Sequence, residues 1–253
     1  MGPGPGPPPT RVTGGGAEPV DRVAMSTSAS ETPDSGSSDG VRAAGLRLAD
    51  EVRALMADLH RLEATAAGLG AAAGHVGAAR ATIAGPVRRR WYEVDADGVD
   101  DAVRARLSRE HGDNSLYRGG RNPLAPPMTV SQGTAPDGTP LVVGEVHVGR
   151  GREGPPGRLH GGFLAGLFDD VMSGVPRLVD AGPAVTARLS IRYRRATPID
   201  TDLRFEAWVE RRSGRRLVAR ARCLADGEVT AEAEALFVSV PHRSGSARGE
   251  AVS

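Results

Sequence analysis

The C-terminal half of the chain contains runs of alternating apolar and polar residues, the pattern of half-buried β-strands. One strand is expected to begin at Met128, and a second covers 141–148 after the turn signal Pro136-Asp137-Gly138. Four more runs cover 184–194, 202–211, 215–225 and 228–240. Short links, with tight turns at Ser213-Gly214 and Asp226-Gly227, predict that consecutive strands pair antiparallel.

A single apolar segment, 163–179, separates the second strand from the third and is expected to be helical. It is apolar on nearly every side, which is typical of a buried helix. The predicted fold is therefore α+β, with an antiparallel six-stranded sheet wrapped around one long central helix. On the strand after this helix, alternate residues should share one face: Val185, Ala187, Leu189, Ile191 and Tyr193.

The N-terminal part of the chain divides by composition. Residues 1–40 are rich in Pro, Gly and Ser, which predicts disorder, and the same is expected of the polar tail 241–253. Residues 41–90 are predicted to be a helical extension and linker, with a second, weaker helix near 78–83 and a solvated basic linker at 88–90. Residues 91–240 form the predicted main domain, irregular up to a rigid proline loop at 122–127.

The first helix of the extension is expected over 46–62. Its apolar residues recur at spacings of three and four: Leu48, Val52, Leu55, Leu59 and Leu62. Such a stripe is typical of an amphipathic helix, and one interpretation makes this helix an oligomerisation arm.

Composition gives little indication of unusual partners. The formal net charge is +1, so neither nucleic acid nor an anionic membrane surface is an expected partner. The chain lacks a run of about 18 apolar residues and an N-terminal signal-peptide core, which makes the cytoplasm the default expectation. The single cysteine, Cys223, lies in an alternating run and is expected to be buried. His and Cys are too few and scattered to suggest a metal site.

The segment 154–174 contains the residues best suited to chemistry. His160 is followed by Gly161 and Gly162, and the apolar helix begins there. Amide N–H groups in the first turn of a helix have no partner within the helix, and the helix dipole adds positive potential. This arrangement can stabilise a developing oxyanion and therefore suits a thioester carbonyl.

Asp169 and Asp170 interrupt this apolar helix. The two side chains point about 100° apart around the axis, so one role for both is excluded. Asp169 shares a face with Gly162 and Gly166, and this small, polar face could hold a slender substrate, whereas Asp170 is expected to make a structural hydrogen bond or to face solvent. Gly161 and Asp169 lie roughly 12 Å apart along one helix. If both act on one bond, they must come from two protomers.

These residues resemble hotdog-fold acyl-CoA thioesterases, including the phenylacetate-pathway type and the mammalian thioesterase superfamily members. The resemblance rests on His160-Gly161-Gly162, on Asp169 nine residues after the histidine, and on the strand 186–198 with its T-x-x-L-x-I-x-Y-x-R pattern. It covers about residues 122–240. It implies an acyl-CoA substrate, a homodimer or dimer of dimers, and no cofactor apart from coenzyme A as part of the substrate.

The resemblance also implies residue roles. Asp169 would be the general base or nucleophile, Gly161 would donate its N–H to the thioester oxygen, and Thr186 would help to place water. His160 belongs to the motif, either as a cap or in catalysis. The substrate-binding residues implied are Gly162, Asn122, Arg192, Arg194 and Arg195, the three arginines standing where relatives meet the CoA phosphates. All 32 basic residues of the chain are arginine, so a merely solvated strand face explains those three equally well.

One departure from the family pattern is Gly154, where some relatives carry an Asn six residues before the histidine. Two other functions compete with hydrolysis. A non-catalytic acyl-CoA or acyl-carrier binding module would keep the fold without turnover. A hotdog dehydratase or hydratase would need a catalytic His paired with an acid in a D-x-x-x-x-H stretch, and none lies near the helix.

Overall fold

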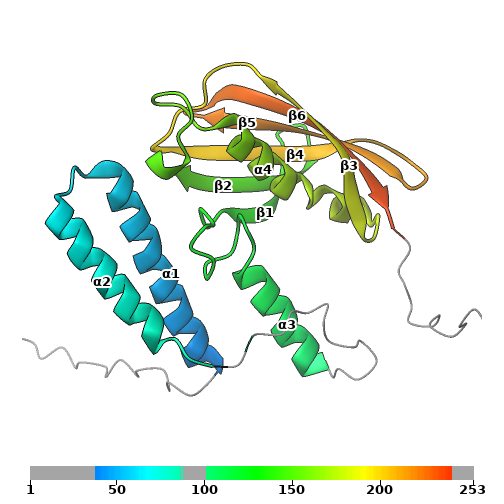
Figure 1. Cartoon of the computed structure of the whole chain (residues 1–253). Helices are drawn as coiled ribbons and strands as arrows, with labels where there is room; N and C mark the ends of the chain where they lie inside the picture. Colours follow the sequence, from blue (N-terminus) through cyan, green and yellow to red (C-terminus); the bar gives the residue numbers. More distant parts are fainter. Residues whose placement is uncertain (1–37, 86, 88–100, 241–253) are drawn as a thin grey trace, which may run out of the picture.

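The structure is a computed structural model that describes residues 38–85, 87 and 101–240. The predicted tail 241–253, the basic linker at 88–90 and nearly all of the N-terminal segment predicted to be disordered lie outside the described residues. The chain forms an α+β domain with a helical extension at its N-terminal side (Figure 1).

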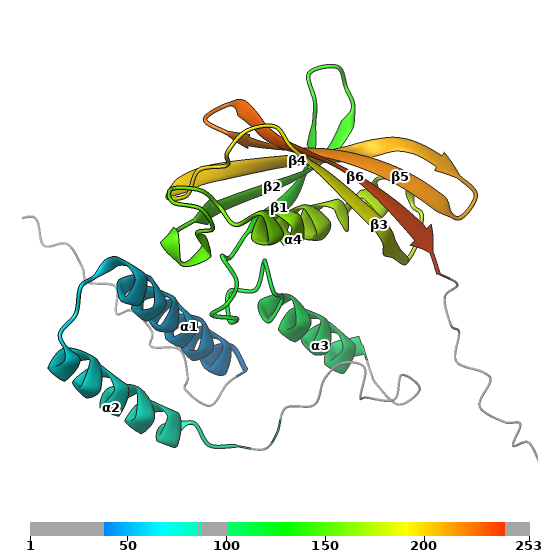
Figure 2. The same ribbon diagram turned by 45° about the horizontal axis from the view of Figure 1, so that its top comes forward.

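The domain is built on one antiparallel sheet of six strands in the order β1-β2-β4-β5-β6-β3. The strands are β1 (Thr129–Thr134), β2 (Pro140–Val148), β3 (Ala184–Tyr193), β4 (Thr201–Ser213), β5 (Arg216–Ala225) and β6 (Glu228–Ser239). The sheet curls around the central helix α4 (Gly161–Met172), as Figures 1 and 2 show from two directions. The hotdog architecture expected from the sequence is confirmed.

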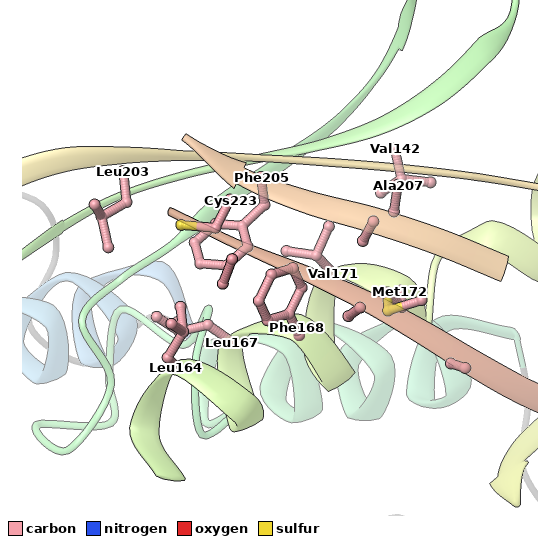
Figure 3. Packing of buried hydrophobic residues seen from close by; sticks show 14 of the residues in the cluster. Val142, Leu164, Leu167, Phe168, Val171, Met172, Leu203, Phe205, Ala207 and Cys223 are labelled. Carbon is pink, nitrogen blue, oxygen red and sulfur yellow. The ribbon is translucent and has the colours of Figure 1, made fainter. Parts of the chain in front are cut away.

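The core lies between the concave face of the sheet and α4. Five residues of α4 are buried: Leu164, Leu167, Phe168, Val171 and Met172. Phe168 packs edge-on against Phe205 of β4, with ring centroids 5.1 Å apart (Figure 3). Cys223 is fully buried in the same cluster, as its alternating context predicted. Burial of these side chains fixes the sheet on one face of α4.

The central helix is shorter than the predicted span 163–179. The α-helix ends at Met172, and a separate 3-10 turn, η4 (Val175–Val179), follows it. Pro176 stands at the start of η4; a proline inside an α-helix lacks the N–H and collides with the preceding turn. Helix α4 is also not buried on every side, because Gly162 and Asp169 are exposed in this chain.

A β-bulge in β3 changes which residues face the helix. The pairing of β3 with β6 shifts register between Thr186 and Arg188. Thr186 is opposite Phe237, whose side chain is in the core, and Leu189 is opposite Ala235, which is also in the core. The predicted common face that included Val185 and Ala187 is therefore wrong, because the extra residue of a bulge reverses the alternation.

The extension consists of α1 (Ser38–Arg61), α2 (Ala66–Thr82) and α3 (Asp101–Asp113). In both views all three lie on the side of the sheet that α4 covers (Figures 1 and 2). Helix α2 is longer than the predicted segment 78–83. The prediction that 91–127 is irregular is wrong for α3, a mostly polar helix without the apolar periodicity that marks a helix in a sequence.

Helix α1 buries only part of the predicted stripe, since Val52 and Leu55 are half-buried. Leu48 and Leu59 are exposed, whereas Ala49 is buried. Arg53 donates hydrogen bonds to the carbonyl oxygens of Gly120 and Asn122, at 2.9 and 3.0 Å. Near the other end of the helix, Arg42 binds both carboxylate oxygens of Asp113 in α3, at 2.7 and 2.8 Å. Polar contacts to a loop and to α3 therefore add to the apolar packing of α1, and Leu48 and Leu59 of its stripe stay open to solvent.

Two further properties concern the helices. Helix α2 buries no residue, although it is rich in Ala and Gly. Among the described helices, none has the length and apolar character needed to cross a membrane.

Candidate active site

The first turn of α4 is capped by a side chain, and one of its amide N–H groups has no acceptor within the ranges that the structure describes. His160 is the N-cap, and its Nδ1 accepts a hydrogen bond from the Gly162 N–H at 3.1 Å. Nδ1 therefore carries no proton in this arrangement. The Gly161 N–H has no acceptor among the described residues. In the described part of the chain the predicted oxyanion donor is therefore left without an acceptor. His160 caps the helix, and its role in catalysis stays a prediction.

A tyrosine holds this entrance against the edge of the sheet. The hydroxyl of Tyr193, on β3, donates a hydrogen bond to the Gly161 carbonyl oxygen at 2.9 Å. Tyr193 belongs to the strand pattern seen in the sequence, but no role was predicted for it. Because β3 is the edge strand, the position of the Gly161 amide depends on that edge.

The Asp169 carboxylate lies on the open face of α4, the face on which Gly162 is also exposed. Thr186 Oγ1 donates a hydrogen bond to Asp169 Oδ1 at 2.9 Å. Both side chains are exposed in this chain. The structure therefore brings together two of the residues predicted to be catalytic, on a surface that a second molecule could cover.

Asp170 has a structural environment, as predicted. Its Oδ2 accepts a hydrogen bond from Arg118 Nε at 2.5 Å, and its backbone oxygen accepts one from Arg118 Nη2. Burial raises the pKa of Asp170, and the Arg118 guanidinium partly offsets that rise. An acid whose charge is balanced inside the protein is poorly placed to serve as a base, so Asp169 remains the candidate.

The distance between Gly161 and Asp169 follows from their positions in one α-helix. Both belong to α4, eight residues apart, which corresponds to about 12 Å of rise. Catalytic contacts to a single carbonyl need about 3 Å. A single chain cannot bring both groups to one thioester carbon.

A cavity of about 350 Å³ lies next to the entrance of α4. Its lining includes His160, Gly162 and Phe163 from the motif, together with residues that precede the motif: Tyr117, Gly151, Arg152 and Glu153. The volume is within the range of small-molecule sites. The predicted binding residue Gly162 therefore does line a cavity.

Tyr117 is the residue of this cavity that sequence reasoning missed. Its ring meets Phe163 edge-on, with centroids 5.7 Å apart. A Cβ added to Gly166 would overlap the Tyr117 hydroxyl oxygen, so the tyrosine fills the space above that glycine. The small, polar face predicted for Gly162, Gly166 and Asp169 is thus divided by a side chain from outside the motif. The glycine at position 166, within a helix, is the one sequence feature that could have indicated a close neighbour.

Asn122 is engaged within its own loop. Its Nδ2 lies 3.3 Å from the carbonyl oxygens of Asn114 and Ser115, and its Oδ1 accepts a hydrogen bond from the Leu124 N–H at 3.0 Å. These contacts use both ends of the side-chain amide. Its predicted role in substrate binding stays a prediction.

The three predicted phosphate-binding arginines belong to β3 and the turn after it. Arg192 is opposite Glu232 and, with Arg194, lines a 520 Å³ hollow that also includes Trp208. Arg194 forms an ion pair with Glu232 at 2.5 Å, and Arg195 forms one with Glu228 at 2.8 Å. The structure does not bring these arginines to Asp169. Two of them already have carboxylate partners, and their predicted role stays a prediction.

Gly154 lies close to His160, so the family's asparagine would be a tight fit at this position. Its N–H donates to the Arg158 carbonyl oxygen at 2.8 Å. A Cβ added here would lie 3.0 Å from His160 Cα and 3.4 Å from His160 Cβ. The loop therefore packs against the N-cap histidine, and a larger side chain would displace one or the other.

Comparison with known proteins supports this architecture. The thioesterase superfamily model matches residues 156–233. A crystal structure of a thioesterase superfamily protein is 28% identical with a TM-score of 0.58, and the match covers 77% of this chain and 94% of that one. This share is larger than the sheet domain alone, so the match extends into the N-terminal part of the chain.

Two other relatives are more distant. Acyl-coenzyme A thioesterase THEM4 of Xenopus laevis is 31% identical over 90 residues, which is 35% of this chain and 40% of that protein. The phenylacetic acid degradation protein PaaI of Thermus thermophilus is 22% identical with a TM-score of 0.39, over 45% of this chain and 93% of that one. These last values are too low to support an inference. The family match over residues 156–233, the fold and the crystal structure together make the C-terminal domain of this chain similar to proteins of the thioesterase superfamily.

Proposed function

We propose that the protein is an acyl-CoA thioesterase, which hydrolyses an acyl-CoA thioester to the free acid and coenzyme A. The observation that carries this proposal is the hydrogen bond between Thr186 and Asp169 on the open face of α4. The match to the thioesterase superfamily supports it, and so does the similarity to a protein named acyl-coenzyme A thioesterase. No cofactor is needed for this reaction, since coenzyme A enters as part of the substrate.

The active unit in this proposal is a homodimer, or a dimer of dimers. The unpartnered Gly161 N–H of one protomer polarises the thioester carbonyl, and Asp169 of the other protomer acts on the carbonyl carbon. Two chains are required because the Gly161 amide and the Asp169 carboxylate of one helix are about 12 Å apart. Closure of the interface over the open face of α4 would also desolvate Asp169 and strengthen its interactions.

Two routes fit the position of Asp169. In the first, Asp169 accepts a proton from water while the water oxygen attacks the carbonyl carbon; the C–S bond then breaks and the leaving thiolate takes up a proton. In the second, a carboxylate oxygen attacks the carbonyl carbon, the C–S bond breaks, and coenzyme A leaves as a thiolate that takes up a proton; water then hydrolyses the resulting anhydride to the free acid and the Asp169 carboxylate. The Thr186 hydroxyl orients Asp169 Oδ1 in both routes and leaves Oδ2 for the reaction. Removal of one oxyanion-hole donor costs about 2.7–4 kcal/mol of transition-state stabilisation in an acyl-transfer enzyme.

The test is thiol release from a panel of aliphatic and aromatic acyl-CoA esters. Wild type should hydrolyse at least one ester, and Asp169→Asn should reduce kcat by a factor of about 10³ or more. Asp226→Asn is the matched control, since Asp226 lies in the β5–β6 turn with a φ of 51°, a conformation that Asn tolerates. Burial raises the pKa of Cys223 to about 12, so its protonated thiol does not interfere with a thiol reagent.

The outcomes separate the two functions. Full turnover by Asp169→Asn would exclude Asp169 as the catalytic carboxylate. Binding of acyl-CoA without turnover by wild type would favour the non-catalytic binding module instead.

A further inference from the structure

Tyr117 belongs to the segment between α3 and β1, outside the motif, yet its hydroxyl is the group nearest to Gly166. The overlap with an added Cβ shows direct contact between this hydroxyl and the backbone of α4. Gly166 is one turn after Gly162 and three residues before Asp169 on the open face of the helix. Tyr117 therefore stands across that face, between the entrance of the helix and the carboxylate.

The position of Tyr117 is fixed from both sides. The next residue, Arg118, is bound to the Asp170 carboxylate and backbone oxygen of α4. The Tyr117 carbonyl oxygen accepts a hydrogen bond from the Met128 N–H at 2.8 Å, at the start of β1. Burial raises the pKa of Tyr117, and the charges of Asp170 and Asp169 raise it further. The tyrosine is thus held by a backbone that is anchored to both the helix and the sheet.

Tyr117 is one of the residues that line the cavity at the entrance of α4. Tyr117 and Phe163 form an edge-to-face aromatic pair in its lining. The guanidinium of Arg152 lies 5.0 Å from the centre of the Phe163 ring, and Arg152 Nη2 donates to the Leu124 carbonyl oxygen of the proline loop. The two aromatic rings offer an apolar surface for an acyl group. Gly161 and Asp169 are about 12 Å apart along α4, and the Tyr117 side chain lies between them.

We infer that Tyr117 is the end wall of the acyl-binding pocket and sets the length of acyl group that the pocket accepts. This inference rests on the proposed thioesterase function, because it takes the thioester carbonyl to lie at the Gly161 amide. An acyl chain starting there passes Gly162 and Phe163 and meets the Tyr117 ring. A short or compact acyl group fits before the wall, whereas a long chain must displace it.

The extension supports this wall, which gives α1 a function in substrate selection. Arg53 of α1 binds the carbonyl oxygens of Gly120 and Asn122, a few residues after Tyr117. His60, at the end of α1, lies against Gly151, a residue of the same cavity; a Cβ on that glycine would be 3.4 Å from His60 Cδ2. The pocket is therefore built from the motif together with segments that the extension holds in place.

The experiment compares wild type with Tyr117→Ala and with Leu116→Ala, a neighbour whose side chain is 53% exposed. The quantity is the ratio of kcat/KM for dodecanoyl-CoA to kcat/KM for hexanoyl-CoA. Tyr117→Ala should raise this ratio about tenfold or more, since pockets distinguish a single methylene by roughly that factor. Leu116→Ala should leave it unchanged. Tyr117→Leu, which keeps an apolar side chain against Phe163 but is too short to reach Gly166, carries the same expectation in case Tyr117→Ala does not fold.

Binding is measured in parallel with the non-hydrolysable thioethers S-hexyl-CoA and S-dodecyl-CoA by calorimetry. The ratio of their Kd values should shift in favour of S-dodecyl-CoA in the Tyr117 variants by a similar factor. If the Tyr117 variants show this shift relative to wild type but wild type hydrolyses no ester, the assignment of Tyr117 as the end wall stands and the thioesterase proposal fails. The assignment of Tyr117 as the end wall is contradicted if the kcat/KM and Kd ratios of the Tyr117 variants equal those of wild type. It is also contradicted if no variant binds a thioether.

Discussion

Thr186 Oγ1 donates a hydrogen bond to Asp169 Oδ1 at 2.9 Å, joining the edge strand β3 to the central helix α4. The contact exists because the bulge after Thr186 gives this residue the inner face of the sheet, opposite the core residue Phe237. Without the bulge, Thr186 would share the outer face with Ser190 and Arg192. The bulge therefore completes the candidate catalytic pair.

Loss of the Thr186 hydroxyl should reduce kcat more than it changes KM. A hydrogen bond to a charged group contributes about 1.5–3 kcal/mol, so Thr186→Val should lower kcat by about tenfold or more. Thr186→Ser keeps the hydroxyl and should retain most of the activity. Steady-state kinetics on the best ester checks this. Equal losses in the Val and Ser variants would mean that the methyl group, and not the hydroxyl, matters.

The Gly161 amide can be removed without removing the helix. Gly161 is the first residue of α4, a position where proline is favoured, and the preceding His160 has φ −61° and ψ 127°, which suits a residue before proline. Gly161→Pro should lower kcat by about 10²–10³, the effect of deleting one oxyanion donor. Gly161→Ala keeps the N–H and meets the Tyr193 hydroxyl at 3.3 Å, so it controls for the added Cβ. Comparable activity in the two variants would exclude the amide as the donor.

The contact between Tyr117 and Gly166 predicts a strong coupling in stability. Gly166→Ala should lower the free energy of unfolding by about 1–3 kcal/mol, because the new methyl overlaps the tyrosine hydroxyl. In a Tyr117→Ala background the same change should become neutral or stabilising, by up to about 1 kcal/mol, since alanine favours helices over glycine. Gly74→Ala in α2, where an added Cβ meets nothing within 4 Å, is the control and should be stabilising in either background. Chemical denaturation measures all of these; additive effects of the two substitutions would contradict the contact.

The outer face of the sheet predicts a dependence of stability on pH. Burial alone would raise the pKa of Glu206. The hydrogen bonds and charges of Arg204 and Arg222, whose nitrogens lie at 2.9 and 2.8 Å, together outweigh burial, so the pKa of Glu206 is below its ordinary value. A lowered folded-state pKa adds stability above the ordinary glutamate value of about 4.3, and this contribution is lost as the pH falls through the folded-state pKa.

Glu206→Gln should therefore destabilise the protein by about 1 kcal/mol at neutral pH, and the difference from wild type should shrink on acidification below about pH 4. Urea unfolding at a series of pH values measures it. A difference that stays constant or grows in acid would show that Glu206 does not act through its charge.

The strands of the fold were predictable because alternation is a local signal. Each predicted strand has a counterpart in the sheet, and the central helix was expected from its apolar sequence. The end of α4 was misjudged because Val175 and Leu178 continue the apolar pattern past Pro176 in a 3-10 turn. Helix α3 was missed since its contacts are polar, such as the Arg42–Asp113 ion pair, and polar pairing leaves no periodicity in a sequence.

The candidate site was predictable to the extent that it is local. The first turn of α4 and the carboxylate two turns later are set by spacing along one helix, and Asp169 could be separated from Asp170 by their directions around the axis. The bulge at Thr186, the Tyr193 contact with Gly161 and the position of Tyr117 over Gly166 depend on tertiary packing between distant segments. Such contacts leave little trace in one sequence beyond an unexplained glycine.

The central claim is that two protomers share each site, with the Gly161 amide from one chain and the Asp169 carboxylate from the other. It is tested most directly by the thiol-release activity of Gly161→Pro and Asp169→Asn chains, each inactive alone, after they are unfolded together in equal amounts and refolded. In a mixed dimer one site carries both defects and the other carries none, so activity should return to about a quarter of the wild-type value. Activity that stays at the sum of the two separate variants, although mixed oligomers form, would contradict a shared site.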